Sequence, residues 1–428
     1  MRELIFITIF SLMGGGDLLW WRWADNKLRR LRKGSSVPRM TLGAFSIGMM
    51  FYLVAVFLLP GATRRSGGPI PIVVHTAAFL WHLLVLPVLL VTSILAFSWR
   101  GLGTAIRLVR DLPNPNMARS DSWHGRLACA VLSTRDSARA GRQAGRPCHE
   151  IPTRSRRDLI GAAAVALPPL LMAGTTVAAM SQLSDLRVRR FELKFPGLRP
   201  ALDGMTIAHV SDLHVGKFTR KRDLRQVVDV TNSLKCDFVA VTGDLIDLSL
   251  ADLPRALTAI RKLDPRNGLF ICEGNHDLIE NRGEFERRML ASGLAFLLES
   301  EKTTELRGEK IQFLGTRWSH SDEELADSMS RVKPLIKDDV FPILLAHHPH
   351  AFDPAIRAGI PLTLSGHTHG GQIMLNEKLG FGPAMFRYWS GLYQKGDSSM
   401  VVSNGAGNWF PLRINAPAEI VHLTLRSL

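Results

Sequence analysis

The sequence has few cysteines. Their positions give no indication of a small domain held together by zinc or by disulfides. Only four occur among 428 residues: Cys129, Cys148, Cys236 and Cys272. Their spacing matches neither a zinc ribbon nor a disulfide framework. We expect Cys236 and Cys272, which flank or occupy predicted strands, to be buried free thiols.

The C-terminal part of the chain lacks an excess of basic charge. The whole chain carries +15, from 53 Lys and Arg against 38 Asp and Glu. Residues 1–186 hold 22 basic and 9 acidic side chains, so +13 of this charge lies there and only +2 lies in the remainder. Because nucleic-acid binding needs a basic surface, we expect no nucleic-acid partner.

The N-terminal part contains apolar windows without the polar face of an amphipathic helix. Since about 20 apolar residues cross the hydrocarbon core of a bilayer, we predict four membrane spans. The first includes Asp17 and three glycines, which makes it the weakest. The four windows are Leu4–Trp21, Leu42–Leu59, Ile70–Phe97 and Ile160–Met180.

Basic residues between these windows predict the orientation. Seven Lys or Arg fall in Arg22–Arg39 and twelve Arg in Arg100–Arg157, but only two in Gly61–Gly68. Positive loops stay in the cytoplasm, so the chain after the last window is expected outside it. The motif Ser155-Arg156-Arg157 resembles a twin-arginine export signal. The ordinary positive flank of a signal-anchor helix explains it equally well.

The expected organisation has four parts. About three transmembrane helices occupy residues 1–99, and a basic cytoplasmic loop occupies 100–157, with an aromatic-poor stretch at Asp111–Thr153. A transmembrane signal-anchor helix covers 158–182. A catalytic α/β domain covers 187–428.

Short apolar runs with β-branched residues recur in this last part, bounded by turn residues and separated by polar or helical stretches. Such runs predict buried strands of an α/β fold. Ligands of α/β proteins gather on the loops that follow the carboxyl ends of strands. The runs are Met205–Ser211, Phe238–Thr242, Leu269–Glu273, Ile311–Gly315, Ile343–Ala346 and Leu362–Ser365.

Five short polar motifs follow these runs in a fixed order. They offer carboxylate, amide and imidazole ligands, a mixture that Mn²⁺, Fe²⁺ and Zn²⁺ accept. Two such ions about 3.5–4 Å apart hold a hydroxide and clamp a phosphoryl group. Each motif alone is weak evidence, because Asp212 or Asp244 also fits a helix N-cap. The motifs are Asp212-Leu213-His214, Gly243-Asp244, Gly274-Asn275-His276-Asp277, His347 and Gly366-His367-Thr368-His369.

This ordered set resembles the calcineurin-like metallophosphoesterases, in particular a bacterial membrane-anchored branch related to UDP-2,3-diacylglucosamine hydrolases. The resemblance runs from about Arg190 to the C-terminus and implies a four-layer α/β/β/α sandwich preceded by the transmembrane helices. It implies two divalent metals, with Asp244 bridging them. One metal would be held by Asp212, His214, Asp244 and His369, and the other by Asp244, Asn275, His347 and His367.

The resemblance also assigns residues that are not metal ligands. His276 would donate to the phosphate or to the leaving oxygen, and general acid catalysis contributes about 10²–10⁴-fold. Asp277 is expected to orient His276, so both are predicted to be catalytic. Of the adjacent His347 and His348, the family's His-x-Pro pattern favours His347.

The function implied is a membrane-anchored phosphodiesterase that cleaves a phosphodiester or pyrophosphate bond in a small-molecule or lipid-linked substrate. We expect it in the bacterial cytoplasmic membrane with its catalytic domain outside. One alternative is UDP-2,3-diacylglucosamine hydrolysis in lipid A synthesis, a cytoplasmic reaction. Another is a metal-loaded sensor or binding module. The apolar stretch Leu379–Trp389 could receive a lipid chain or simply cover the edge of the sandwich.

Overall fold

The computed structural model describes residues 2–31, 36–58, 71–110, 156–376 and 379–428. The predicted Gly61–Gly68 loop, Ser155, Cys129, Cys148 and most of the predicted cytoplasmic loop lie outside these residues. Two compact units make up the chain. One unit contains Met1–Ile47 and His82–Pro169, and the other contains Gly48–Trp81 and Leu170–Leu428.

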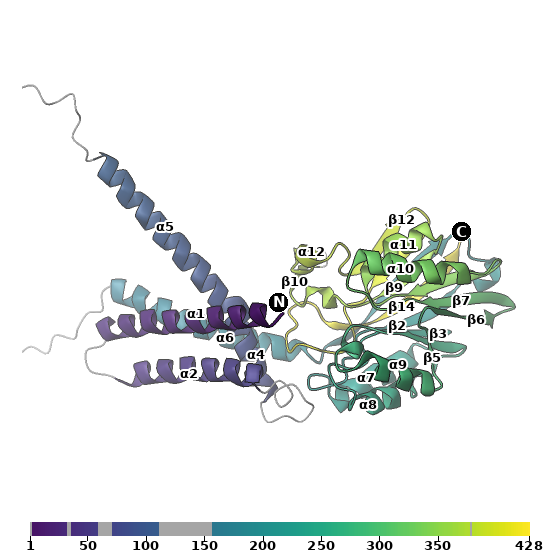
Figure 1. Cartoon of the computed structure of the whole chain (residues 1–428), viewed down its shortest axis with the longest axis horizontal. Helices are drawn as coiled ribbons and strands as arrows, with labels where there is room; N and C mark the ends of the chain where they lie inside the picture. The colour runs from purple at the N-terminus through teal and green to yellow at the C-terminus, as the bar shows by residue number, and fades with distance from the viewer. Residues whose placement is uncertain (1, 32–35, 59–70, 111–155, 377–378) are drawn as a thin grey trace, which may run out of the picture. The chain divides into compact units, whose positions relative to one another are not determined.

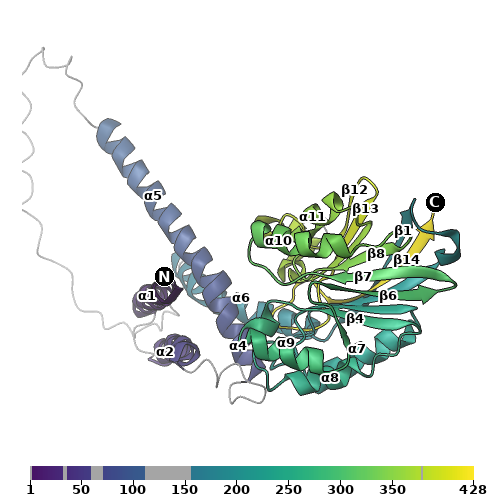
Figure 2. The ribbon, with the colours of Figure 1, turned by 45° about the vertical axis from the view of Figure 1, so that its right-hand side comes forward.

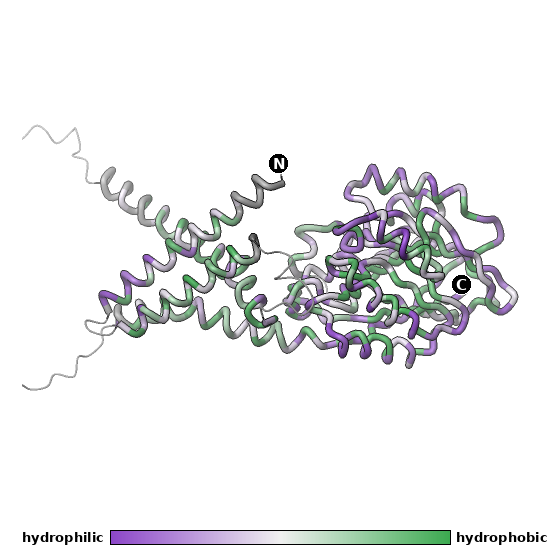
Figure 3. Tube along the Cα trace, turned by 60° about the horizontal axis from the view of Figure 1, so that its bottom comes forward, coloured by the Kyte–Doolittle hydropathy of each residue, from purple (hydrophilic) through white to green (hydrophobic). Residues whose placement is uncertain are grey.

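The N-terminal region is helical (Figure 1). Its helices are α1 (Arg2–Leu31), α2 (Val37–Leu58), α4 (Ile72–Leu80), which continues through a π-helical turn at Trp81–Val85 into α5 (Leu86–Arg110), and α6 (Arg156–Gln182). Apolar residues predominate along α2, α4 and α6, as the hydropathy colouring of Figure 3 shows.

Three stretches of the described helices are long and apolar enough to cross a membrane: Val37–Ala55, Ile72–Trp99 and Leu159–Gln182. They match the last three predicted windows. The first predicted window, Leu4–Trp21, is helical as part of α1 but does not meet this criterion. Length and composition therefore support three of the four predicted spans.

Two six-stranded sheets form the C-terminal domain. The first has the order β1 (Leu186–Phe195), β14 (Ala418–Ser427), β2 (Met205–Val210), β3 (Phe238–Thr242), β4 (Gly268–Cys272) and β5 (Ala295–Phe296). The second has the order β12 (Gly391–Lys395), β13 (Ser398–Val402), β9 (Leu362–Ser365), β8 (Phe341–Leu345), β7 (Glu309–Gly315) and β6 (Ser300–Leu306). All six strands predicted from apolar runs are present, with ends shifted by two residues or fewer.

The two sheets pack face to face and enclose the main hydrophobic core. Phe270 and Phe313, from opposite sheets, stack with ring centroids 3.9 Å apart, and Phe238 packs against both. This core explains why the strands are almost wholly apolar, since each sheet is covered on its other face as well.

Helices cover both outer faces (Figure 2). On the first sheet lie α7 (Lys221–Ser233), α8 (Leu253–Ile260) and α9 (Arg282–Ala291), and on the second lie α10 (Asp322–Val332) and α11 (Phe352–Arg357). In α7 the buried residues Leu224, Val227 and Val228 recur at helical spacing, so one face packs on the sheet and the other is polar. The predicted four-layer sandwich is confirmed.

An excursion after β9 contains the short strands β10 (Met374–Asn376) and β11 (Leu379–Gly380) and the single-turn α12 (Gly382–Met385). Trp389 is buried in a cluster with Met374 and Ala416, so at this residue the structure agrees with the second alternative, that the stretch covers the edge of the sandwich. Leu379, Phe381 and Met385 are 53%, 51% and 62% exposed. These three large apolar side chains of the stretch lie at the surface.

Candidate metal centre

The loops after five strands bring all the predicted ligands to one rim of the sandwich. Parallel strands β2, β3 and β4 of the first sheet and β8 and β9 of the second end at this rim, so their following loops meet there. Buried or half-buried residues from these loops form the cluster: Asp212, His214, Asp244, Asn275, His347, His367 and His369.

The first group consists of Asp212, His214 and His369, all buried. The Nε2 atoms of the two histidines lie 3.0 Å apart. Asp212 Oδ1 lies 3.2 Å from His369 Nε2 and 3.8 Å from His214 Nε2. Three potential ligand atoms thus converge on one point.

The second group consists of Asp244, His347 and His367, with the amide of Asn275 among them. Asn275 Oδ1 lies 3.2 Å from His347 Nε2 and 2.8 Å from His367 Nδ1. His347 Nδ1 donates a hydrogen bond to the Thr242 carbonyl at 2.7 Å, so Nε2 is the ring nitrogen that faces the candidate ligands and would bind a metal.

Asp244 lies between the two groups. Its Oδ2 is 3.3 Å from His214 Nε2 in the first group and 3.2 Å from His347 Nε2 in the second. Its Oδ1 accepts a hydrogen bond from the backbone N–H of His276 at 2.8 Å. A carboxylate in this position can contact two cations at once.

The backbone of these loops is held in an uncommon conformation. Non-glycine residues with positive φ cost free energy and cluster at functional sites. Five of the seven cluster residues have positive φ: Asp212 (55°), His214 (42°), Asp244 (52°), His367 (73°) and His369 (50°). Neighbouring glycines permit the close approach, since a Cβ at Gly366 would collide with Ser211 and Asp212.

The electrostatics of the cluster fit divalent cations. Burial lowers the pKa of the His347 imidazole, but the carboxylates of Asp244 and Asp212 outweigh burial and raise it to about 10. The same contacts hold the pKa of Asp244 below its usual value against the effect of burial. Buried carboxylates here require a positive charge, and the mixture of carboxylate, amide and imidazole donors is one that divalent metals accept.

His276 lies beside the first ligand group but is a member of neither the first nor the second group. Its ring contacts that of His214, with centroids 4.5 Å apart. Its Nδ1 lies 2.6 Å from the Asp247 carbonyl and 3.4 Å from Asp247 Oδ1. Nδ1–H therefore donates to Asp247, and Nε2 is left for another partner.

Asp247 was not among the site residues predicted from the sequence. It is buried, and it also approaches His214 Nδ1 at 3.8 Å. With His214 and His276 it forms a third cluster of possible metal ligands. The signal available in the sequence was its position three residues after Asp244, in Gly243-Asp244-Leu245-Ile246-Asp247.

Asp277 does not orient His276, which corrects the expected role. Its Oδ1 accepts hydrogen bonds from the N–H groups of Leu245 and Ile246, and its Oδ2 accepts one from Gly274 N–H. Burial and the nearby Asp244 raise the pKa of Asp277 to about 8. This side chain joins the Asp244 loop to the Asn275 loop and so acts on the backbone of both.

The other histidines near the rim lie outside the cluster. His209 Nε2 pairs with Thr242 Oγ1 inside β2, as expected for a core histidine. His348 Nδ1 accepts a hydrogen bond from the backbone N–H of His350 at 3.1 Å. His347, in contrast, places its Nε2 3.2 Å from Asp244 Oδ2 and belongs to the convergent group.

Aromatic residues and a buried arginine complete the surroundings. The ring centroids of Trp318 and His367 lie 4.7 Å apart, and those of Trp409 and His276 lie 5.6 Å apart. The loop carrying Trp409 is held by Arg413, which is buried and donates to the carbonyls of Asn404, Gly407 and Ala416. Arg413 was not predicted from the sequence, because most of its partners are backbone carbonyls; it also donates to Asn408 Oδ1 at 2.6 Å.

Comparisons with known proteins agree with this geometry. The family model for calcineurin-like phosphoesterases matches residues 205–371. A transmembrane protein with metallophosphoesterase domain from Danio rerio is 29% identical over 256 residues, covering 55% of this chain and 56% of that protein. The uncharacterized metallophosphoesterase Cj0846 of Campylobacter jejuni is 30% identical, covering 57% and 64%.

The uncharacterized metallophosphoesterase YkuE of Bacillus subtilis is 31% identical over 236 residues, covering 53% of this chain and 80% of that protein. The chain thus spans less than two thirds of the length of the Danio and Campylobacter proteins, and most of the Bacillus protein. All three similarities concern proteins named for the same domain.

Proposed function

We propose that this chain is a membrane-anchored phosphodiesterase with a lipid-linked substrate. The proposal starts from its family: the chain belongs to the calcineurin-like phosphoesterases and is a metal-dependent phosphoester hydrolase. The bond cleaved is a phosphodiester or a pyrophosphate. The observation that carries the chemistry is the position of Asp244 between two groups of buried ligands, 3.3 Å and 3.2 Å from one histidine of each.

We assign one metal to Asp212, His214, Asp244 and His369, and the other to Asp244, Asn275, His347 and His367. When bound, two divalent ions would supply a nucleophile at neutral pH and neutralise charge on the phosphoryl group. Mn²⁺, Fe²⁺ and Zn²⁺ all suit this donor set.

His276 acts on the substrate in this proposal. Its Nδ1–H is fixed by the Asp247 carbonyl, so Nε2 is directed away from that contact and, when protonated, donates to a phosphoryl or leaving oxygen. Burial lowers the pKa of His276, but Asp244 and Asp247 outweigh burial and raise it to about 9, which favours the protonated donor at neutral pH. Asp277 holds the loop of Asp244 and the loop of Asn275 together through its hydrogen bonds to their backbone N–H groups.

The lipid part of the proposal rests on a segment that touches both the candidate site and an apolar helix of the same compact unit. Trp409 contacts His276, and the next residue, Phe410, packs on Phe79 of α4 with ring centroids 4.5 Å apart. Thr76 of α4 donates to the Pro411 carbonyl at 3.1 Å. These contacts support a site close to the membrane surface.

Exposed apolar side chains near this site support an amphiphilic substrate. Phe386, at the end of the excursion, contacts the His367 ring at 5.4 Å, and Phe381 and Met385 of the same excursion are exposed. An apolar surface beside a phosphoester site is suited to an acyl or polyprenyl chain. The charge of the inter-helix segments supports an extracytoplasmic location.

Turnover of a generic phosphodiester tests the enzymatic part. Full-length protein in detergent, loaded in turn with Mn²⁺, Fe²⁺ and Zn²⁺, should hydrolyse bis(4-nitrophenyl) phosphate with at least one of them. Chelation should abolish turnover, and metal should restore it. Absence of turnover with all three metals, in protein shown to contain them, would favour the sensor or binding module.

A further inference from the structure

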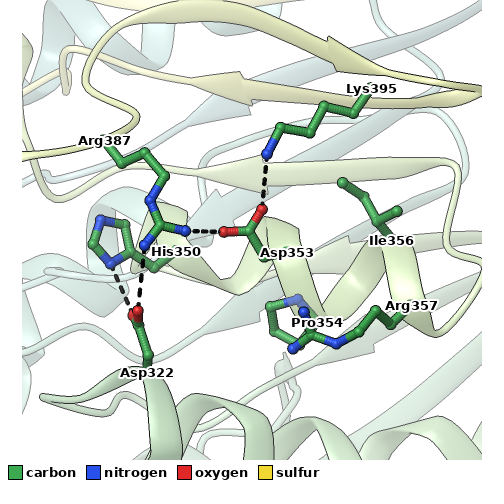
Figure 4. Close-up of a pocket in the computed structure, with 8 residues that line it drawn as sticks. All are labelled: Asp322, His350, Asp353, Pro354, Ile356, Arg357, Arg387 and Lys395. Carbon is green, nitrogen blue, oxygen red and sulfur yellow. Dashed lines mark hydrogen bonds and ion pairs between the residues drawn. The ribbon is translucent and has the colours of Figure 1, made fainter.

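A hollow on the outer side of the second sheet is not used by the proposed chemistry. Its volume is about 460 Å³, which is large enough for a small polar group or part of a ligand. Figure 4 shows its charged side chains converging from four separate segments of the chain. It is lined by Asp322, His350, Asp353, Pro354, Ile356, Arg357, Arg387 and Lys395.

The cations of the hollow exceed its carboxylates. Arg387 and Lys395 both pair with Asp353, and Arg387 also reaches Asp322 at 3.5 Å. Within the described part of the chain, Arg357 forms no ion pair or side-chain hydrogen bond. Three permanent positive charges therefore face two negative ones, which leaves a net attraction for an anion.

The existing ion pairs are of a kind that a ligand can replace. The side chains of Arg387 and Lys395 are 52% and 51% exposed, and that of Asp322 is 62% exposed. Exposed ion pairs contribute little stability because water screens them. A phosphate or carboxylate entering the hollow would offer Arg387 a second bidentate partner in place of the distant Asp322.

A short path of ring contacts leads from the hollow to the metal centre. The His350 ring lies 4.6 Å from that of His348, which in turn lies 5.1 Å from His367 of the second ligand group. Arg387 directly follows Phe386, whose ring also contacts His367. The hollow is therefore separated from the second ligand group by only two side chains, those of His350 and His348.

We propose that this hollow is an oxyanion subsite that binds a second phosphate or carboxylate group of the substrate. The inference rests on the proposed function, because it places the scissile phosphoester at the metals and the second anion beside Arg357 and Arg387. The substrate class it names is a phosphoester with a further anionic group on one side of the bond cleaved.

Calorimetry on the metal-loaded, full-length protein tests this without requiring turnover. The probes are hexanediol monophosphate and hexanediol bisphosphate, which differ only in the second anion. We expect the bisphosphate to bind about tenfold more tightly, because its second group gains charge-assisted hydrogen bonds. The Arg357→Gln variant should lose most of this difference, and Arg387→Gln should reduce it too.

Arg225→Gln is the matched control, since Arg225 is also exposed and forms no ion pair with any residue that the structure describes, but lies on α7. It should keep the tenfold difference. Equal affinity of the two probes for wild type, or an unchanged difference in Arg357→Gln, would overturn the subsite. Arg357 is exposed and unpaired, so its replacement is not expected to impair folding.

A free anion is distinguished in the same experiment. If the hollow takes inorganic phosphate from solution instead, wild type binds two phosphates, Arg357→Gln binds one, and the two hexanediol probes bind equally. That result would keep the oxyanion site and reject its role in substrate binding. Turnover of bis(4-nitrophenyl) phosphate by the same preparation reports separately on the proposed hydrolase.

Discussion

Replacement of Asp247 by Asn tests how His276 is positioned. The change keeps the size of the side chain and removes its charge, which lies 3.4 Å from His276 Nδ1 and 3.8 Å from His214 Nδ1. Loss of a group that supports a metal-site histidine lowers activity or metal affinity 10–100-fold. Because the 2.6 Å bond from Nδ1–H to the Asp247 carbonyl remains, we expect the lower end, about tenfold in kcat or ~1.4 kcal/mol.

The pH profile separates this role from general destabilisation. Burial lowers the pKa of His276, and Asp244 and Asp247 raise it, so removal of the Asp247 charge lowers it. A general acid is lost as pH rises through its pKa, and the alkaline limb of the kcat profile should therefore move to lower pH in Asp247→Asn. The assay is hydrolysis of bis(4-nitrophenyl) phosphate, with metal content measured in parallel.

Asp229→Asn serves as the control, because Asp229 is exposed on α7 and has no ion pair among the described residues. It should leave kcat and the profile unchanged. A wild-type kcat and an unshifted alkaline limb in Asp247→Asn would refute the positioning role.

Three further predictions address His276, the topology and the lipid surface. His276→Ala should keep its metals and lose about 10²–10⁴-fold in kcat, and retention of normal kcat would remove it from the mechanism. Alkaline phosphatase fused after Leu428 should be active and a fusion near Ala130 inactive, whereas the reverse pattern would favour cytoplasmic UDP-2,3-diacylglucosamine hydrolysis. Phe381→Ser with Met385→Ser should raise KM several-fold for a lipid-linked phosphodiester but not for bis(4-nitrophenyl) phosphate; equal effects on both substrates would contradict a lipid-binding surface.

The strands and the convergence of the motifs were predictable because both depend on local patterns. Apolar runs such as Phe238–Thr242 end where a polar motif begins, and parallel strands place the loops that follow them at one rim. Side chains from motifs that follow neighbouring strands therefore meet at this rim. This is why the predicted ligands Asp244, His347 and His367 lie together in the structure.

Other features depend on contacts between distant segments and could not be read from local patterns. Trp389 lies in a stretch rich in Gly and aromatic residues that suggests a surface loop, yet it packs on Met374 and Ala416. Arg413 is fixed by carbonyl groups, which carry no mark in the sequence. Asp277 was expected to orient its neighbour His276, but the turn directs it to the backbone of the preceding loop.

The charged hollow illustrates the same limit. Its lining comes from α10, α11, the segment after α12 and the end of β12. In the sequence, Arg357 and Arg387 look like two ordinary exposed arginines among many. They line one hollow because the fold places the segment after α12, which carries Arg387, beside the end of α11, which carries Arg357.

The metal content of Asp244→Asn tests the central claim most directly, because Asp244 is assigned to both metals and lies 3.3 Å and 3.2 Å from one histidine of each ligand group. Elemental analysis of purified full-length protein should give two divalent ions per wild-type chain and per Asp229→Asn chain. Asp244→Asn should contain clearly fewer than two and should lack phosphodiesterase activity, since a neutral amide is a poor ligand for two cations. Two ions per chain together with wild-type turnover in Asp244→Asn would contradict a dinuclear centre shared through this carboxylate.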